Sequence, residues 1–293
     1  MRTSVRLRAG RGWVEIRRWV APARGPSSAA PTDRDRVPIL VVGCHRSGTS
    51  LVRRILDSHS RIACPPETLM LEPLGAVLSH DAAEKGFAGI GVTLDDAASE
   101  LGALAERWMR RYADAKGKPR WAEKSPATFN QLPAVDRMFG RNARFLLVVR
   151  DGRDVARSLG AGNWSILRPW VERHGDPFVA GAHYWVDANR KMLAFRDAVP
   201  ERTHVLRYED LVTRPEDTLR AVFAFLEEPW EEAVLDFNRF PHDAGVEDHV
   251  VSSTWKIEDA RGKHAEMPED LRGRVAAIVE STMLALGYPP ITG

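Results

Sequence analysis

Near residue 40, a short apolar run leads into a glycine-rich loop, and this order limits the folds that the chain can adopt. Residues 37–42, Val-Pro-Ile-Leu-Val-Val, are followed by Gly43-Cys-His-Arg-Ser-Gly48, and apolar residues then recur at helical spacing over 51–56. An apolar run of this length is typical of a buried strand in a parallel sheet. Because unpaired backbone N–H groups at a helix start attract anions, the order strand, loop, helix predicts a phosphate-binding loop.

Strands and helices continue to alternate along the chain. Apolar runs predict further buried strands over 145–149 and 204–208. Helical spacing is found over 94–115, 126–139, the segment that carries Val155 and Leu159, 176–198, 215–226 and 268–286. We therefore predict an α/β fold of the phosphate-loop (P-loop) type, with a mainly parallel sheet flanked by helices. Residues 36–293 are expected to form a single domain.

Residues 1–35 differ from the rest and are predicted to be a basic N-terminal arm and linker. Before Asp33 this segment contains seven arginines and only one acidic residue, Glu15. A stretch rich in Pro, Ser and Ala runs from Pro22 to Pro31. Trp13, Ile16 and Val20 have the spacing of a short amphipathic helix, which predicts peripheral contact with an anionic membrane surface. The alternative is a frayed basic arm, or a helix that packs on its own domain.

Composition excludes several classes of protein. No apolar run approaches the roughly 18–20 residues that span a bilayer. A formal net charge of +2 gives no reason to expect a nucleic-acid partner. Two cysteines, Cys44 and Cys64, with no C-x-x-C or H-E-x-x-H motif, argue against a disulfide scaffold and the common zinc sites. The lack of a secretory apolar core predicts a cytoplasmic location, and the excess of arginine over lysine suits a bacterial source.

The loop departs from that of nucleotide hydrolases at one position. Those loops have a lysine after the second glycine, where this chain has Thr49, and the cation lies inside the loop at Arg46. A guanidinium can bind a phosphate or sulfate with two parallel hydrogen bonds. The loop therefore predicts an anionic nucleotide and counts against an ATP-dependent kinase or hydrolase.

A second anion site is predicted where the strand over 145–149 ends. Arg150 follows this strand directly, and Ser158 lies about two helical turns further on, so both face the same side. Together they are candidates for holding a second phosphate. The alternative is a surface helix on which Arg150 pairs with Asp154.

Taken together, these motifs resemble the PAPS-dependent sulfotransferases, in particular the branch with the tyrosylprotein and many bacterial enzymes. The resemblance covers about residues 37–290 and rests on Gly43-Cys-His-Arg-Ser-Gly-Thr-Ser-Leu51, Asp57-Ser-His59, Cys64-Pro-Pro-Glu67-Thr68, Trp121-Ala-Glu-Lys124-Ser-Pro126, Val149-Arg-Asp-Gly-Arg-Asp-Val-Ala-Arg-Ser158, Arg207-Tyr-Glu-Asp-Leu211 and a late Ser253 with Lys263-His264. The chain departs from the pattern at His45, where proline is common, at Pro66, and in the short spacing from Ser253 to Lys263.

The resemblance implies 3′-phosphoadenosine 5′-phosphosulfate (PAPS) as donor, 3′,5′-ADP (PAP) as product, and no metal. Glu67 is the implied base, with His59 and His45 as alternatives, and Arg46 and Lys124 are the implied cations at the transferred group. The implied contacts to the 5′-phosphosulfate come from the loop residues His45, Arg46, Ser47, Gly48, Thr49 and Ser50. Those to the 3′-phosphate and adenosine come from Arg150, Ser158, Tyr208, Ser253 and Lys263, with Lys256 as an alternative to Lys263 and a core role as the alternative for Tyr208.

The sequence indicates the residues that would bind the acceptor less clearly than those that would bind the donor. Trp164, Trp170, Trp185 and Met70 are either the lining of an apolar acceptor pocket or part of the core. We expect the hydroxyl of a small molecule, sugar, lipid or phenol, with a protein tyrosine as the alternative. The remaining alternative is a non-catalytic nucleotide-binding protein that kept the fold. Oligomeric state is not readable from the sequence.

Overall fold

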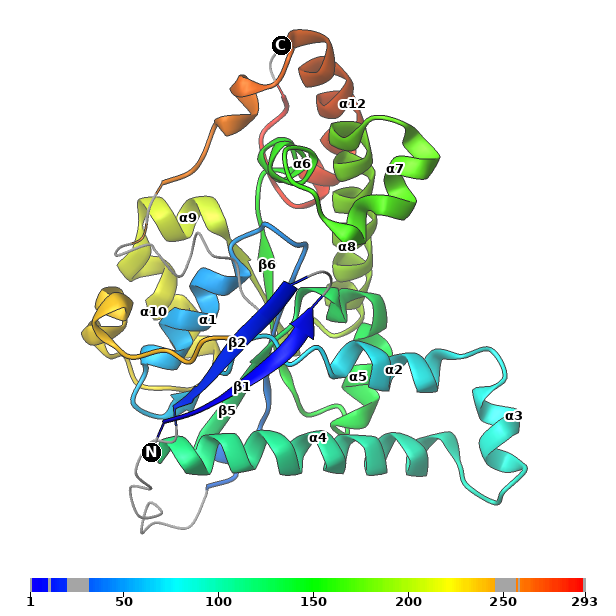
Figure 1. The fold of residues 1–293 in the computed structure, drawn as a ribbon, viewed down its shortest axis with the longest axis vertical. Coiled ribbons are helices and arrows are strands. Elements are labelled where there is room, and N and C mark those ends of the chain that lie inside the picture. The colour runs from blue at the N-terminus through cyan, green and yellow to red at the C-terminus, as the bar shows by residue number, and fades with distance from the viewer. Residues whose placement is uncertain (1, 10–11, 20–31, 246–256, 258, 292–293) are drawn as a thin grey trace.

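The computed structural model describes residues 2–9, 12–19, 32–245, 257 and 259–291, with side chains from residue 32 onward. Within this part of the chain, five parallel strands form the central sheet in the order β4-β5-β3-β6-β7 (Figure 1). The strands are β3 (Ile39–Gly43), β4 (Ile62–Ala63), β5 (Arg120–Lys124), β6 (Arg144–Val149) and β7 (Thr203–Arg207). The predicted α/β fold with a mainly parallel sheet is confirmed, and the three predicted strands are β3, β6 and β7.

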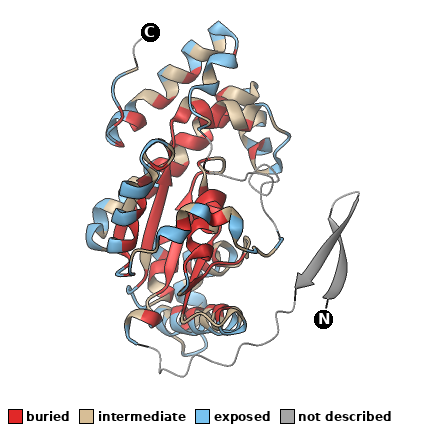
Figure 2. Ribbon diagram, turned by 90° about the vertical axis from the view of Figure 1, so that its left-hand side faces the viewer, coloured by how far each residue is buried: buried red, intermediate tan, exposed pale blue. Residues whose placement is uncertain are grey.

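Side chains of the central strands alternate between two apolar cores, one on each face of the sheet. In β3, Ile39 and Val41 belong to one core, while Leu40 and Val42 belong to the other. This is the period of two that a strand buried on both faces requires. Figure 2 shows the buried strands enclosed between helices.

Helices cover both faces of the sheet. The core that contains Ile39 is closed by α1 (Thr49–Ser58), α9 (Tyr208–Thr213), α10 (Pro215–Phe225) and the 3-10 helix Glu232–Arg239. The core that contains Leu40 is closed by α2 (Leu71–Ser79), α4 (Leu94–Lys116), α5 (Leu132–Met138), α6 (Gly152–Gly160), α8 (Pro177–Ala198) and α12 (Glu269–Ala285). The described residues also form two short α-helices, α3 (Ala83–Ala88) and α7 (Arg168–His174), and short 3-10 helices at Arg34–Arg36, Ser165–Leu167, Pro200–Arg202 and Lys263–Glu266.

Strand β5 was not predicted from the sequence, because its residues are not mainly apolar. Arg120 and Glu123 are 1% exposed and Lys124 is 0% exposed. The strand is stable because these charges have partners: Arg120 Nη1 lies 3.1 Å from Glu228 Oε1 and donates to the Leu226 carbonyl at 2.6 Å. A buried charge without such partners would be strongly unfavourable.

Three local predictions differ from the structure. The amphipathic helix proposed around Trp13 and Ile16 is wrong: β1 (Arg2–Ala9) and β2 (Gly12–Trp19) pair as antiparallel strands, in keeping with the apolar–charged alternation over 14–17. The segment predicted as one helix over 126–139 is a 3-10 helix, Pro126–Gln131, followed by α5. Tyr208 begins α9 rather than ending β7.

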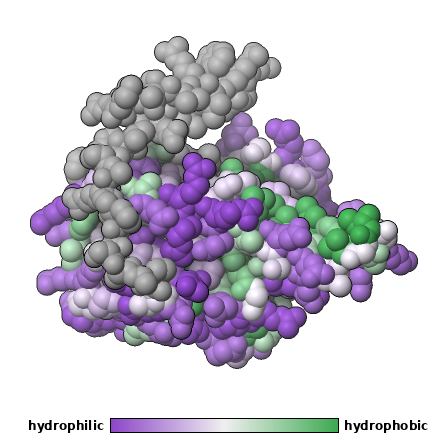
Figure 3. Space-filling model, turned by 90° about the horizontal axis from the view of Figure 1, so that it is seen from below, coloured by the Kyte–Doolittle hydropathy of each residue, from purple (hydrophilic) through white to green (hydrophobic). Residues whose placement is uncertain are grey.

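The surface of the described residues includes an apolar area over α2 and α3. A groove between α2 and α3 is lined mainly by apolar side chains, and Val77 and Ile90 are 47% and 75% exposed. Figure 3 shows this apolar area at the α2–α3 end of the molecule. Among the helices described, none is long and apolar enough to cross a bilayer.

Candidate active site

The candidate site lies where the carboxyl ends of β3, β5, β6 and β7 meet. In open α/β sheets, ligands bind beyond this edge, because the loops that follow parallel strands converge there. The loops and helix starts after these strands carry most of the predicted donor-binding residues. The sheet order places the β3 loop between β5 on one side and β6 and β7 on the other (Figure 1).

The loop after β3 is compact and depends on two glycines. A Cβ on Gly43 would lie 2.6 Å from the Val148 carbonyl oxygen, and one on Gly48 would lie 2.7 Å from Cδ2 of Tyr208. Gly48 also has φ of 95°, in the left-handed region. Helix α1 starts at Thr49, so the backbone N–H groups of its first turn are available at the loop. The predicted phosphate-loop geometry is therefore present.

Arg46 links the loop to the second predicted motif. Its Nε donates to Ser158 Oγ at 3.0 Å, and its guanidinium carbon lies 5.0 Å from the centre of the Trp164 ring. Ser158 belongs to α6, which follows β6. The two motifs that the sequence linked to a nucleotide thus meet in space, and Trp164, 37% exposed, stands beside the loop cation.

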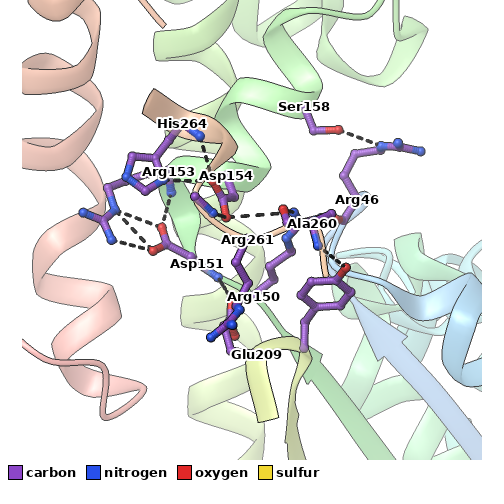
Figure 4. A network of polar contacts seen from close by, with 12 residues as sticks. Arg46, Arg150, Asp151, Arg153, Asp154, Ser158, Glu209, Ala260, Arg261 and His264 are labelled. Atoms are coloured by element: carbon purple, nitrogen blue, oxygen red, sulfur yellow. Dashed lines mark hydrogen bonds and ion pairs between the residues drawn. The ribbon is translucent and has the colours of Figure 1, made fainter. Parts of the chain in front are cut away.

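Arg150 is held at the end of β6 by groups from three other segments (Figure 4). Its Nη1 donates to the Arg46 carbonyl at 3.3 Å and its Nη2 to the Ala260 carbonyl at 2.5 Å. The guanidinium lies over the Tyr208 ring at 4.4 Å, and the Tyr208 hydroxyl accepts from Ala260 N at 3.3 Å. Arg150 is 9% exposed and 3.9 Å from Asp154, so the alternative of an exposed surface pair does not describe it.

Asp154 attaches the segment 259–266 to α6. Its carboxylate accepts from Gly262 N at 2.9 Å and from His264 N at 2.8 Å, and it contacts His264 Nδ1 at 2.9 Å (Figure 4). The predicted contact residue Lys263 is exposed on this segment. Ser253 and Lys256 lie outside the described residues.

Glu67 and Lys124 come together although 57 positions separate them. Lys124 Nζ donates to Glu67 Oε1 at 2.5 Å and to Ser50 Oγ at 3.2 Å. Lys124 is fully buried, and the Glu67 side chain is 14% exposed. Because Ser50 lies in the first turn of α1, the candidate base and one candidate cation lie directly beside the loop.

The two histidines named as alternative bases have different surroundings. His59 is fully buried, stacks on Phe223 and hydrogen-bonds the Pro229 carbonyl at 2.9 Å, so core contacts account for it. His45 Nδ1 hydrogen-bonds the Tyr184 hydroxyl at 2.6 Å. Burial, together with the charges of Lys124 and Arg46, lowers the pKa of His45 to about 4, so its ring is neutral at pH 7.

The predicted acceptor residues divide between site and core. Trp185 is fully buried and its Nε1 donates to the Arg150 carbonyl at 3.1 Å, so it belongs to the core that supports β6. Trp170 packs edge-on against Tyr184, and Met70 packs against the same core. Tyr184 could not be predicted as a neighbour of the site, because no motif marks it. Asp154, four residues after Arg150, was expected only as a surface partner of that arginine.

The buried polar groups of the site fit an anionic ligand. Ser47 Oγ and Arg150 Nε are both buried, and neither has a hydrogen-bond partner among the described residues. Buried polar atoms are normally paired, so such groups point to a missing partner. The described residues contain no cluster of three or more His, Cys, Asp or Glu side chains able to hold a metal ion.

Comparisons with known proteins point to one family. A model of the sulfotransferase family matches residues 38–232. Protein-tyrosine sulfotransferase from Drosophila melanogaster is 27% identical over 212 residues, which cover 71% of this chain and 41% of that protein. Protein-tyrosine sulfotransferase 1 from Danio rerio is 26% identical over 275 residues, which cover 88% of this chain and 74% of that protein. The chain thus spans less than half the length of the Drosophila relative.

Two solved structures share the fold. The sulfotransferase domain from the curacin biosynthetic pathway superposes with a TM-score of 0.62 at 21% identity, covering 86% of this chain and 98% of that domain. The sulfotransferase domain of the Synechococcus PCC 7002 olefin synthase has a TM-score of 0.61 at 20% identity, covering 90% and 100%. Because the family model matches more than half of a chain whose fold and loop geometry agree with it, this protein belongs to the sulfotransferase family.

Proposed function

We propose that this protein transfers a sulfuryl group from PAPS to an acceptor hydroxyl, with Glu67 as the base and Arg46 and Lys124 as the cations at the transferred group. The observation that carries the proposal is the Glu67–Lys124 pair, 2.5 Å apart beside Ser50 at the start of α1. A kinase or hydrolase would need the loop lysine that Thr49 replaces.

The donor fits the polar groups of the loop and of β6. The backbone N–H groups of the loop and the hydroxyls of Ser47, Thr49 and Ser50 would hold the 5′-phosphosulfate. Arg150 and Ser158 would hold the 3′-phosphate. The unpartnered Ser47 Oγ and Arg150 Nε support both assignments. Tyr208 would lie at the adenosine side, and Ser253 and Lys263 remain predicted contacts.

When bound, PAPS supplies a sulfuryl group activated by its bond to a phosphate. Glu67 accepts the acceptor's proton as the acceptor oxygen bonds to sulfur and the bond from sulfur to the phosphate oxygen breaks. Arg46 and Lys124 stabilise the negative charge that develops on the sulfuryl and bridging oxygens. By analogy with phosphoryl transfer, positioning and charge stabilisation supply most of the catalysis.

The acceptor is proposed to be a hydroxyl of a small molecule, sugar, lipid or phenol, or alternatively of a protein tyrosine. The relatives named protein-tyrosine sulfotransferases support a phenolic hydroxyl. Aromatic side chains beside the loop, Trp164 and Tyr184, are compatible with a planar acceptor. A cytoplasmic location remains a prediction. Peripheral membrane contact through the basic arm now rests only on the arginines of residues 1–35, because the amphipathic helix proposed there is not formed.

Calorimetric titration with PAP, compared with ATP and magnesium, tests the donor without an acceptor. We expect PAP to bind and ATP with magnesium to bind weakly. Arg46→Ala should lose PAP binding by at least about tenfold, because charged hydrogen bonds contribute roughly 1.5–3 kcal/mol.

The catalytic assignment is tested with PAPS and a panel of alcohols, phenols, sugars and a tyrosine peptide. Glu67→Gln should bind PAP like the wild type and lose turnover, since the amide cannot accept the proton. Binding of ATP with magnesium but not PAP would refute the donor. Full turnover by Glu67→Gln would refute the base.

A further inference from the structure

A second buried carboxyl lies beside the catalytic pair and is not used by the proposed chemistry. Glu123 precedes Lys124 in β5 and is 1% exposed. Its Oε1 accepts from Thr68 Oγ1 at 2.6 Å and from Ser125 Oγ at 2.5 Å. Ser125 Oγ in turn accepts from Leu69 N at 3.2 Å. Glu123 therefore holds the segment that immediately follows Glu67 directly at Thr68, and indirectly, through Ser125, at Leu69.

These hydrogen bonds hold a strained piece of backbone. Leu69 has a backbone φ of 55°, in the left-handed region, which is unfavourable for a residue other than glycine. Such conformations persist where the surroundings over-determine them, and they concentrate at functional sites. Here the Thr68 hydroxyl donates to Glu123 of β5, and the Leu69 N–H donates to Ser125, the residue that follows β5. The turn after Glu67 therefore cannot relax without breaking one of these two hydrogen bonds.

Burial makes the hydrogen bonds of the Glu123 carboxyl necessary. Desolvation raises the pKa of Glu123, while the hydroxyl donors Ser125 and Thr68 oppose that shift. A buried carboxyl without hydrogen bonds would be strongly unfavourable. An apolar side chain would fill this position of β5 without that penalty, so packing alone does not explain Glu123.

The proposed chemistry gives these contacts a role. Lys124 has two tasks: it pairs with Glu67 and it stabilises charge on the transferred group. When Lys124 turns toward that group, Glu67 loses its partner at 2.5 Å and needs another support to stay in place. The Thr68–Glu123 hydrogen bond does not involve Lys124 and would remain.

We propose that Thr68 and Glu123 form a clamp that positions Glu67 for proton transfer during turnover. The clamp consists of Glu123, Thr68, Ser125 and the backbone of Leu69. Thr68 and Glu123 act through Glu67 and are positioning residues. The inference rests on the proposed function, since it assumes that Glu67 is the base.

Thr68→Val tests the clamp, because valine keeps the shape of threonine and removes its hydroxyl. We expect kcat to fall about 10–100-fold, the loss typical of a catalytic group misplaced by about 1 Å. The KM for PAPS and the affinity for PAP should stay within about twofold of wild type. Thr68→Ser restores the hydroxyl and should recover most of kcat.

Thr128→Val is the matched control. Thr128 is 1% exposed, and its Oγ1 has no hydrogen-bond partner among the described residues. The same chemical change there should leave kcat and PAP binding at wild-type values. Thermal unfolding of each variant shows that it is folded, and Glu123→Ala serves as a second, more drastic variant.

The outcomes separate the clamp from the function on which it rests. If Thr68→Val has the kcat of the wild type while Glu67→Gln is inactive in the same assay, the clamp is refuted and the proposed function still holds. If Thr68→Val lowers PAP affinity and thermal stability together with kcat, the clamp is also refuted, because such a pattern indicates a merely structural contact. Absence of PAP binding or of any turnover by the wild type would refute the proposed function itself.

Discussion

Replacing Gly48 by alanine tests how the loop and the donor site are joined. Gly48 has φ of 95°, and a Cβ there would lie 2.7 Å from Cδ2 and 3.3 Å from Cε2 of Tyr208. The Tyr208 ring in turn lies 4.4 Å from the Arg150 guanidinium. A single methyl group therefore strains the backbone, displaces an aromatic ring and disturbs the residue proposed to hold the 3′-phosphate.

The expected loss of stability is the sum of two effects. A left-handed conformation costs a residue other than glycine about 1–2 kcal/mol. Forcing an extra methyl group into a packed site costs about 1–3 kcal/mol more. The free energy of unfolding should therefore fall by roughly 2–5 kcal/mol.

Gly91→Ala separates the two effects. Gly91 has φ of 77°, but a Cβ there would meet no atom within 4 Å. It should lose only the conformational part, about 1–2 kcal/mol, and keep wild-type PAP affinity. The assays are urea unfolding and calorimetric titration with PAP, in which Gly48→Ala should bind at least about tenfold more weakly, a change of roughly 1.4 kcal/mol.

Equal destabilisation by the two substitutions would refute the steric reasoning, since both share the same backbone strain. Wild-type PAP affinity in Gly48→Ala would refute the link from the loop through Tyr208 to Arg150. Either result is readable without knowledge of the acceptor.

Two further predictions concern stability. Glu228→Ala leaves Arg120 buried without its ion-pair partner and should lower the free energy of unfolding, measured in urea, by about 3–5 kcal/mol. Glu216→Ala, which removes an exposed ion pair, should lower it by only about 0–1 kcal/mol. Similar losses for the two variants would contradict the burial argument. The pKa of His45 is lowered from 6.5 to about 4, so the unfolded chain binds a proton that the folded chain excludes, and stability falls as the pH drops below 6.5. Between pH 7 and pH 5 the wild type should lose about 2 kcal/mol more than His45→Asn, and parallel pH profiles would show that His45 does not titrate in this way.

Much of the fold is predictable because it depends on short-range patterns. The strands β3 and β6 and the helices α4 and α8 each show their burial pattern within one element. The meeting of the loop with Ser158 also follows from the sequence, because parallel strands must end at the same edge of the sheet.

The catalytic pair is a different case. Glu67 and Lys124 were identified individually by resemblance to family motifs, but no local pattern indicates that they touch. Strand β5, which carries Lys124, does not even look like a strand, because its charged side chains are acceptable in the core only with partners from distant segments.

The α/β fold and the anion-binding loop follow from the sequence, because they depend on periodicity, on glycines and on neighbours along the chain. The candidate residues of the site were found through the resemblance to family motifs. Tertiary contacts were needed to see which charges are buried together, that Thr68 is hydrogen-bonded to Glu123 beside Glu67, and that Arg150 donates to the Ala260 carbonyl. The physical reason is that a buried polar group is stable only with its partner in place, and that partner comes from a part of the chain that the fold alone brings near.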